Sequence, residues 1–128
     1  MNICIKTAAK RQNPQSVVLD LSDRLPVQVV ESCHISCAYH VTHCKDYYEL
    51  NIKTQGNITI LCQRCLNAFE YHHEHQTVLA VCATEAVAER YMANLECEVA
   101  PDLEIDLSAV VTDDLHLFLP EKHIGECP

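Results

Sequence analysis

Two short motifs in this chain carry side chains that could hold a metal ion or exchange electrons. Cys62-Gln63-Arg64-Cys65 places two thiols three residues apart at the end of an alternating apolar segment. His123 and Cys127 form a second pair close to the C-terminus. Thiolate sulfur and neutral imidazole nitrogen are both good zinc ligands, so the four side chains would make a closed structural set of the Cys3His type.

The Cys62–Cys65 pair also fits two other uses, redox exchange and inert packing. A thioredoxin-type redox pair sits at a helix N-terminus, whereas an alternating pattern precedes Cys62 and no helical pattern follows Cys65. Redox exchange is therefore the least favoured use. In a chain with nine cysteines, the spacing alone leaves a metal site and inert buried thiols equally open. Likewise, His123 and Cys127 could lie in an unstructured chain end.

Two further groups of side chains have simpler interpretations. His73 and His75 share one face of an expected strand, but no third ligand stands at an evident spacing, so we interpret this run as a polar strand surface. Cys33 and Cys37 also share a face, about 13 Å apart along an extended strand, and are therefore expected to be core thiols.

The elements that must position these residues follow from the hydrophobic pattern. Period-two alternation predicts a meander of at least three antiparallel strands, with Gly56-Asn57 as the tight turn of a hairpin. Such a sheet could be open or barrel-like. The expected extended segments are 33–41, 48–53, 58–62, 69–82 and 103–105.

Two helices are expected after the strands. Period-four spacing over residues 84–95 predicts a helix with Thr84 as its N-cap. Asp106 is the expected N-cap of a second helix, which ends before Pro120. Its apolar stripe is predicted to consist of Leu107, Val111, Leu115 and Phe118. The fold class is therefore α+β, with two helices packed on one antiparallel sheet.

Length and charge limit the class of protein. The 128 residues fit a single domain 1–128, with 1–16 weakly structured and 121–128 as a candidate metal-binding tail. A formal net charge of −9 argues against autonomous nucleic-acid binding and favours a basic protein partner. No apolar run is long enough to span a membrane or to form a secretory signal, so a cytoplasmic protein with reduced thiols is expected.

Three blocks of the sequence resemble the YceD family of bacterial and plastid large ribosomal RNA subunit accumulation proteins. Residues 61–69, Leu-Cys-Gln-Arg-Cys-Leu-Asn-Ala-Phe, are similar to its Cys-x-Arg-Cys-x-x-x-Phe signature. Residues 104–107, Glu-Ile-Asp-Leu, followed by an apolar helix ending at Leu119-Pro120, are similar to a second family element. His123-x-x-x-Cys127-Pro128 is similar to a third. The blocks stand in the family's order over residues 58–128.

The resemblance implies a role in the synthesis, processing or stability of 23S ribosomal RNA, and hence in assembly of the large ribosomal subunit. It implies no catalytic activity, so we expect an accessory factor that acts by binding. Because the net charge is −9, we expect it to dock on a basic ribosomal protein or processing factor and to reach ribosomal RNA indirectly. It also adds weight to one structural zinc site formed by Cys62, Cys65, His123 and Cys127. A zinc-binding adaptor unrelated to ribosomes and an oxidoreductase using Cys62 and Cys65 are the alternatives.

Overall fold

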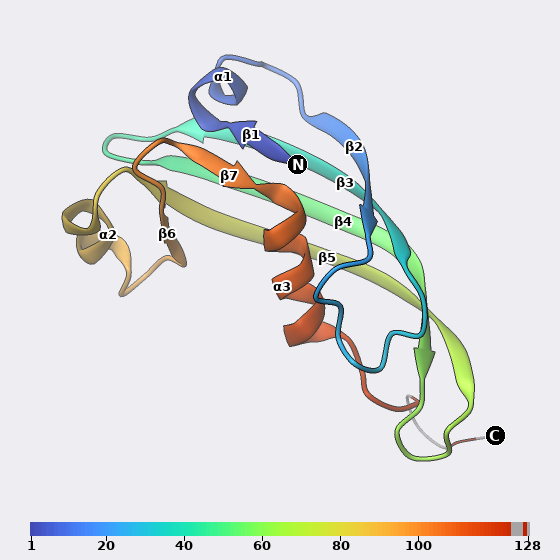
Figure 1. Ribbon diagram of the computed structural model, residues 1–128. Coiled ribbons are helices and arrows are strands. Elements are labelled where there is room, and N and C mark those ends of the chain that lie inside the picture. The colour runs from blue at the N-terminus through green and yellow to red at the C-terminus, as the bar shows by residue number, and fades with distance from the viewer. Residues whose placement is uncertain (124–126, 128) are drawn as a thin grey trace.

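A five-stranded sheet forms the body of the protein in the computed structural model, which describes residues 1–123 and residue 127 (Figure 1). The sheet order is β2-β3-β4-β5-β6, and every pair is antiparallel except the parallel pair β5–β6. A separate two-stranded sheet pairs β1 with β7. The elements are β1 Asn2–Cys4, α1 Ile5–Ala9, β2 Gln15–Leu21, β3 Cys33–His43, β4 Tyr48–Leu61, β5 Ala68–Cys82, α2 Glu85–Tyr91, β6 Cys97–Val99, β7 Glu104–Asp106 and α3 Leu107–Phe118.

The α+β class and the antiparallel meander are confirmed, whereas the sheet is not closed into a barrel. β3, β4 and β5 are the consecutive long strands, and β2 and β6 are the two edges. Figure 1 shows α3 crossing one face of the sheet, with α2 and β6 at one end of β5 and the β4–β5 turn at the other. Among the described residues, no helix has both the length and the apolar character needed to cross a membrane.

The predicted hairpin turn at Gly56-Asn57 is wrong, because β4 runs straight through both residues. A Cβ atom at Gly56 would lie 2.9 Å from the backbone oxygen of His34 and 3.0 Å from Cδ1 of Ile35. The glycine therefore lets β3 approach β4 closely instead of reversing the chain. The real connections of the meander are residues 44–47 and 62–67.

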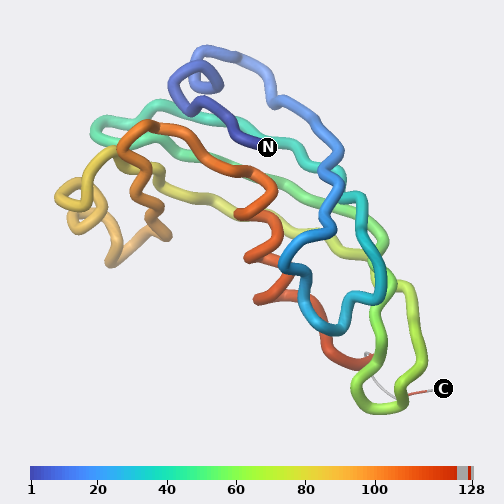
Figure 2. Tube along the Cα trace, viewed as in Figure 1, coloured from blue at the N-terminus to red at the C-terminus, as the bar shows by residue number. Residues whose placement is uncertain are grey.

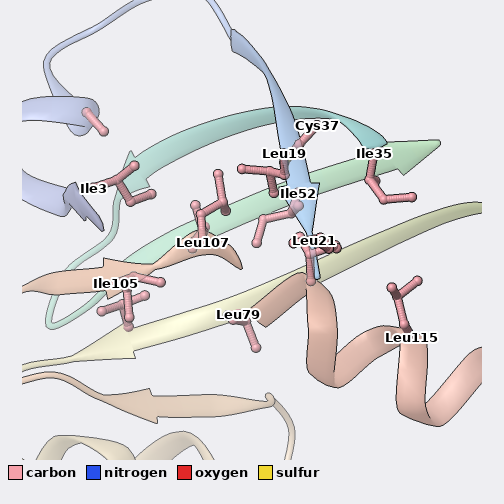
Figure 3. Close-up of a cluster of buried hydrophobic side chains, with 14 of the residues drawn as sticks. Ile3, Leu19, Leu21, Ile35, Cys37, Ile52, Leu79, Ile105, Leu107 and Leu115 are labelled. Atoms are coloured by element: carbon pink, nitrogen blue, oxygen red, sulfur yellow. The ribbon is translucent and has the colours of Figure 1, made fainter. Parts of the chain in front are cut away.

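The two expected helices are present, with the expected N-caps. The side chain of Thr84 accepts a hydrogen bond from the Val87 amide, and that of Asp106 accepts one from the Ala109 amide. On α3, three of the four stripe residues are completely buried: Leu107, Val111 and Leu115. They face the core side chains of the sheet (Figure 3).

Phe118 departs from the predicted stripe, because half of it is exposed. Its ring instead lies against the ring of His75 on β5, with the ring centroids 4.1 Å apart. The end of α3 is thus held over β5 before the chain continues toward the β4–β5 turn, as Figure 2 shows.

The N-terminal segment also differs from the expectation of weak structure. Residues 2–9 form β1 and α1, and Ile3 and Ile5 are buried in the core. The terminal amino group donates a hydrogen bond to the Asp106 carboxylate over 3.2 Å, and the Leu107 amide donates to the Met1 carbonyl over 2.8 Å. The N-terminus therefore helps to fix the start of α3.

Candidate metal centre

The first half of the site is a tight turn between β4 and β5, here called the knuckle turn (residues 62–67). The Cys62 amide donates to the Asn67 carbonyl over 3.0 Å, and the Leu66 amide donates back to the Cys62 carbonyl over 2.8 Å. Leu66 closes the turn with a φ of 64°, in the left-handed region that usually favours glycine. This geometry turns the chain sharply enough for both cysteine side chains to point to the same place.

The second half of the site arrives from α3. The helix ends at Phe118, Leu119 is its C-cap, and residues 120–123 run to the knuckle turn (Figure 1). There the Gln63 amide donates to the Glu121 carbonyl over 2.8 Å, and the His123 amide donates to the Cys62 sulfur over 3.4 Å. Backbone contacts therefore align the C-terminal segment (residues 120–123 and Cys127) with the knuckle turn.

The four predicted ligands come together at this point. One ligand atom from each of Cys62, Cys65, His123 and Cys127 can be chosen so that all four lie within 4.8 Å of one another, and this is the one group of three or more metal-binding side chains in the described part of the chain. Cys62 is buried and the other three are half-buried. This burial is typical of a closed structural site rather than an open catalytic one.

Two of the separations match the edges of a tetrahedral zinc site. The Cys62 and Cys127 sulfurs are 3.7 Å apart, and Nδ1 of His123 lies 3.5 Å from the Cys65 sulfur. With Zn–S of about 2.3 Å and Zn–N of about 2.05 Å, tetrahedral angles give edges of about 3.8 Å for S···S and about 3.6 Å for S···N. The residues present therefore fit a zinc ion, and three sulfurs with one imidazole nitrogen are a donor set that suits zinc.

Electrostatics favour thiolate at one position of the site and oppose it at another. Burial of Cys62 opposes ionisation, but backbone amides of Cys65, His123 and Arg64 donate to its sulfur and lower its pKa to about 5. At Cys65 the backbone amide of Asn67 lowers the pKa, but burial together with Cys127 and Cys62 outweighs it, so the pKa is raised. Thiolates crowded in this way repel one another, and a divalent cation among them would remove the repulsion.

Arg64 and Phe69 contact the ligands directly. Nε of Arg64 donates to the Cys127 sulfur over 2.9 Å, and its guanidinium also reaches the His123 carbonyl over 3.5 Å. A zinc ion with three thiolates carries a net charge of −1, which the guanidinium would balance. The Phe69 ring stacks on the His123 imidazole, with the centroids 4.4 Å apart, and so fixes its orientation. The Cys-x-Arg-Cys-x-x-x-Phe motif singled out both residues, but nothing in the sequence indicated which side chains they contact.

The cysteines and histidines on β3 and β5 lie away from this centre. Cys33 and Cys37 are buried on β3, as predicted for core thiols, and burial raises the pKa of Cys37 to about 11. His73 and His75 lie on one face of β5, with their ring centroids 6.3 Å apart. They belong to no group of three metal-binding side chains among the residues described. Pro128 of the Cys-Pro match lies outside the described residues.

A buried polar cluster beneath α3 was not anticipated. The Thr77 hydroxyl donates to the Asp114 carboxylate over 2.5 Å, and the Thr54 hydroxyl lies 3.2 Å from Nε2 of His73. All four residues are buried. The sequence did indicate that Asp114 would face the sheet, because it follows Val111 by three residues and so lies beside the apolar stripe of α3. The Thr77–Asp114 hydrogen bond joins β5 to α3, and none of the four residues belongs to the candidate metal centre.

Comparisons with family models, with curated proteins and with solved structures gave no match to this chain. The assignment of this site as a metal centre therefore rests on the geometry of the four side chains and on the sequence motifs described above.

Proposed function

We propose that the protein is a non-catalytic accessory factor of the YceD type, acting in the cytoplasm on 23S ribosomal RNA synthesis, processing or stability and thus on large-subunit assembly. The observation that carries the proposal is the meeting of the knuckle turn with the C-terminal segment. Arg64 and Phe69, two residues of the resembling signature, contact Cys127 and His123 of the other resembling block. Sequence blocks that are far apart in the chain thus lie together, which supports a shared site.

We propose a structural zinc ion as the group held there. When bound, zinc would fix four side chains from two distant parts of the chain in one arrangement. Cys62 and Cys65 supply the knuckle side of this arrangement, and His123 and Cys127 supply the other. All four protein ligands are then used, which leaves no open position for a substrate or a reactive water. This closed donor set supports a binding role rather than catalysis.

A thiol–disulfide oxidoreductase has less support. Cys65 is followed by the rest of a turn and then by β5, so the pair lacks the helix N-terminus that activates thioredoxin-type cysteines. In an oxidoreductase, the two cysteines would also need to be free of metal while they cycle. A zinc-binding adaptor unrelated to ribosomes uses the same closed site, and only the identity of its partners separates it from the proposed factor.

The net charge suggests the type of partner. With 18 acidic and 9 basic side chains, the surface should be repelled by phosphate backbones and attracted to basic proteins. We therefore propose that the factor docks on a basic ribosomal protein or an rRNA-processing factor and reaches the RNA through it. Tight binding of the purified chain to naked 23S ribosomal RNA at physiological salt would contradict this indirect route.

Removal of the protein from its cells tests the assignment. The expected result is a loss of mature 23S ribosomal RNA and of large subunits on sucrose gradients, restored by the wild-type chain. A Cys4→Ser chain should restore both equally well, because Cys4 is exposed on β1 and belongs to no metal-binding group in the described residues. Unchanged ribosomal RNA and subunit profiles, with affinity-captured partners that include no ribosome-assembly protein, would favour the unrelated adaptor.

A further inference from the structure

Two sulfurs of the candidate metal centre are placed to react with each other. Those of Cys62 and Cys127 lie 3.7 Å apart, so they need to approach by less than 2 Å to reach the disulfide bond length of about 2.05 Å. Their exposure differs: Cys62 is completely buried, whereas Cys127 is half-buried. A dissolved oxidant would therefore meet Cys127 before Cys62.

We propose that Cys127 is an oxidation site for hydroperoxides, that Cys62 is its resolving thiol, and that the disulfide between them expels the metal ion. The inference rests on the proposed zinc site. It adds a modification that a purely structural zinc ion does not require.

The chemistry balances with a hydroperoxide as the oxidant. The Cys127 thiolate attacks the terminal peroxide oxygen and the O–O bond breaks. With one proton, the products are the sulfenic acid of Cys127 and water from hydrogen peroxide, or the corresponding alcohol from an organic hydroperoxide. The Cys62 thiolate then attacks the Cys127 sulfur and displaces hydroxide. Two thiolates lose two electrons in total, and the peroxide gains them. Oxidation removes two of the four metal ligands, so the zinc ion dissociates and the Cys65 sulfur takes up a proton.

Local contacts assist the reaction between the Cys127 and Cys62 sulfurs. Arg64 donates to the Cys127 sulfur over 2.9 Å, which places a positive charge where the peroxide must release an anionic oxygen. On the other side, the His123 amide donates to the Cys62 sulfur over 3.4 Å and holds that sulfur facing the C-terminal segment. Cys65 lies against Nδ1 of His123 at 3.5 Å. The buried thiolate is thus aligned with Cys127.

The structural consequence of oxidation differs from that of simple metal loss. A disulfide between Cys62 and Cys127 still ties the C-terminal segment to the knuckle turn, while Cys65 and His123 lose their common ligand. The oxidised protein should therefore lack the zinc ion but keep the C-terminal segment covalently linked to the knuckle turn. Chelation of the reduced protein would remove the zinc ion and, with it, the link between the C-terminal segment and the knuckle turn.

Peptide mapping of the full-length protein tests the inference. Cleavage after Lys53, Arg64, Arg90 and Lys122 places the three cysteines of the site in the separate peptides 54–64, 65–90 and 123–128. The zinc content of the reduced protein is measured first. One equivalent of hydrogen peroxide is then added, released zinc is measured with a chromogenic chelator, and free thiols are alkylated before digestion. We expect one zinc ion released per chain, peptide 54–64 linked to 123–128, and alkylated Cys65.

The control variant is Cys4→Ser, which removes an exposed thiol whose pKa is lowered by the hydroxyl of Thr7. It should release zinc and form the same linked peptides as the wild type. Retained zinc, a link between 54–64 and 65–90, or irreversible oxidation of Cys127 with Cys62 still alkylated would each overturn the inference. A reduced protein without zinc would overturn the metal site itself, and this result is recorded before any oxidant is added.

Discussion

Replacement of Cys65 by serine should release the C-terminal segment and leave the core of the sheet intact. The substitution removes one of the four candidate ligands but keeps the size of the side chain. Cys65 is half-buried and lies in neither buried apolar cluster. The effect of Cys65→Ser should therefore arise from lost metal binding and not from lost packing.

The contacts of the C-terminal segment set the expected magnitude. The hydrogen bond between Gln63 and Glu121 contributes about 1 kcal/mol. The stack of Phe69 on His123 contributes a further ~1 kcal/mol. Ordering the backbone of residues 120–123 costs about 4–8 kcal/mol, so these two contacts alone do not hold the segment. At free zinc of 100 times its dissociation constant, the ion adds about 2.7 kcal/mol to the free energy of unfolding.

Urea unfolding in zinc and in chelator measures this contribution. Wild type should lose about 2–3 kcal/mol of unfolding free energy on chelation. In the presence of zinc, the free energy of unfolding of Cys65→Ser should be about 2–3 kcal/mol below that of wild type. In the presence of chelator, the two proteins should be nearly equal in stability. Among the described residues, hydrogen exchange should quicken only at residues 62–69, 120–123 and 127. The control variant Cys4→Ser should follow wild type in both conditions.

Two results would refute this reasoning. One is an unfolding free energy of the wild type that chelation leaves unchanged. The other is a Cys65→Ser variant that is destabilised equally in zinc and in chelator, since its effect would then come from packing. Faster exchange throughout β3 and β4 in the variant would also contradict the independence of the core.

Three further predictions concern the sheet and the knuckle turn. Gly56→Ala should lower the free energy of unfolding by about 1–3 kcal/mol in urea titrations, because its Cβ would lie 2.9 Å from the His34 backbone oxygen; a neutral effect would show that β3 can move away. His73→Gln should flatten the pH dependence of the free energy of unfolding. Burial lowers the pKa of His73 in the folded protein, so the unfolded chain takes up a proton at a higher pH than the folded one. The wild type therefore loses stability as the pH falls below about 6.5. His72→Gln, at an exposed neighbouring position, is the control. If the free energy of unfolding changed equally with pH in the two variants between pH 7.5 and 5.5, the prediction would be contradicted. Leu66→Gly should raise the free energy of unfolding by about 0.5–1 kcal/mol, because glycine adopts the φ of 64° without strain and the leucine side chain is exposed; a loss of stability would show that this side chain is needed.

Local patterns predicted α2, α3 and the long strands β3 and β5, because each is determined by neighbouring residues. Thr84 and Asp106 each have a side-chain oxygen that can reach an amide three residues later, so both N-caps follow from the sequence. The error at Gly56 has a different origin. Glycine is used both in turns and where two backbones approach closely, and only the position of β3 distinguishes the two uses.

The candidate site was predictable in its residue types but not in its contacts. Cysteine and histidine spacing named the four candidate ligands, whereas their meeting depends on where α3 ends relative to the β4–β5 turn. Phe118 illustrates the limit: its spacing placed it in the apolar stripe, but α3 ends beside β5, where the ring contacts His75. Such contacts depend on tertiary packing, which periodicity does not encode.

Elemental analysis of freshly purified, reduced protein tests the central claim most directly. The four candidate ligands predict close to one zinc ion per chain in the wild type, and Cys65→Ser purified in parallel should contain much less. Cys4→Ser should retain the wild-type content. Wild-type protein that contains no zinc and takes up none from solution, with unchanged stability in chelator, would contradict the account.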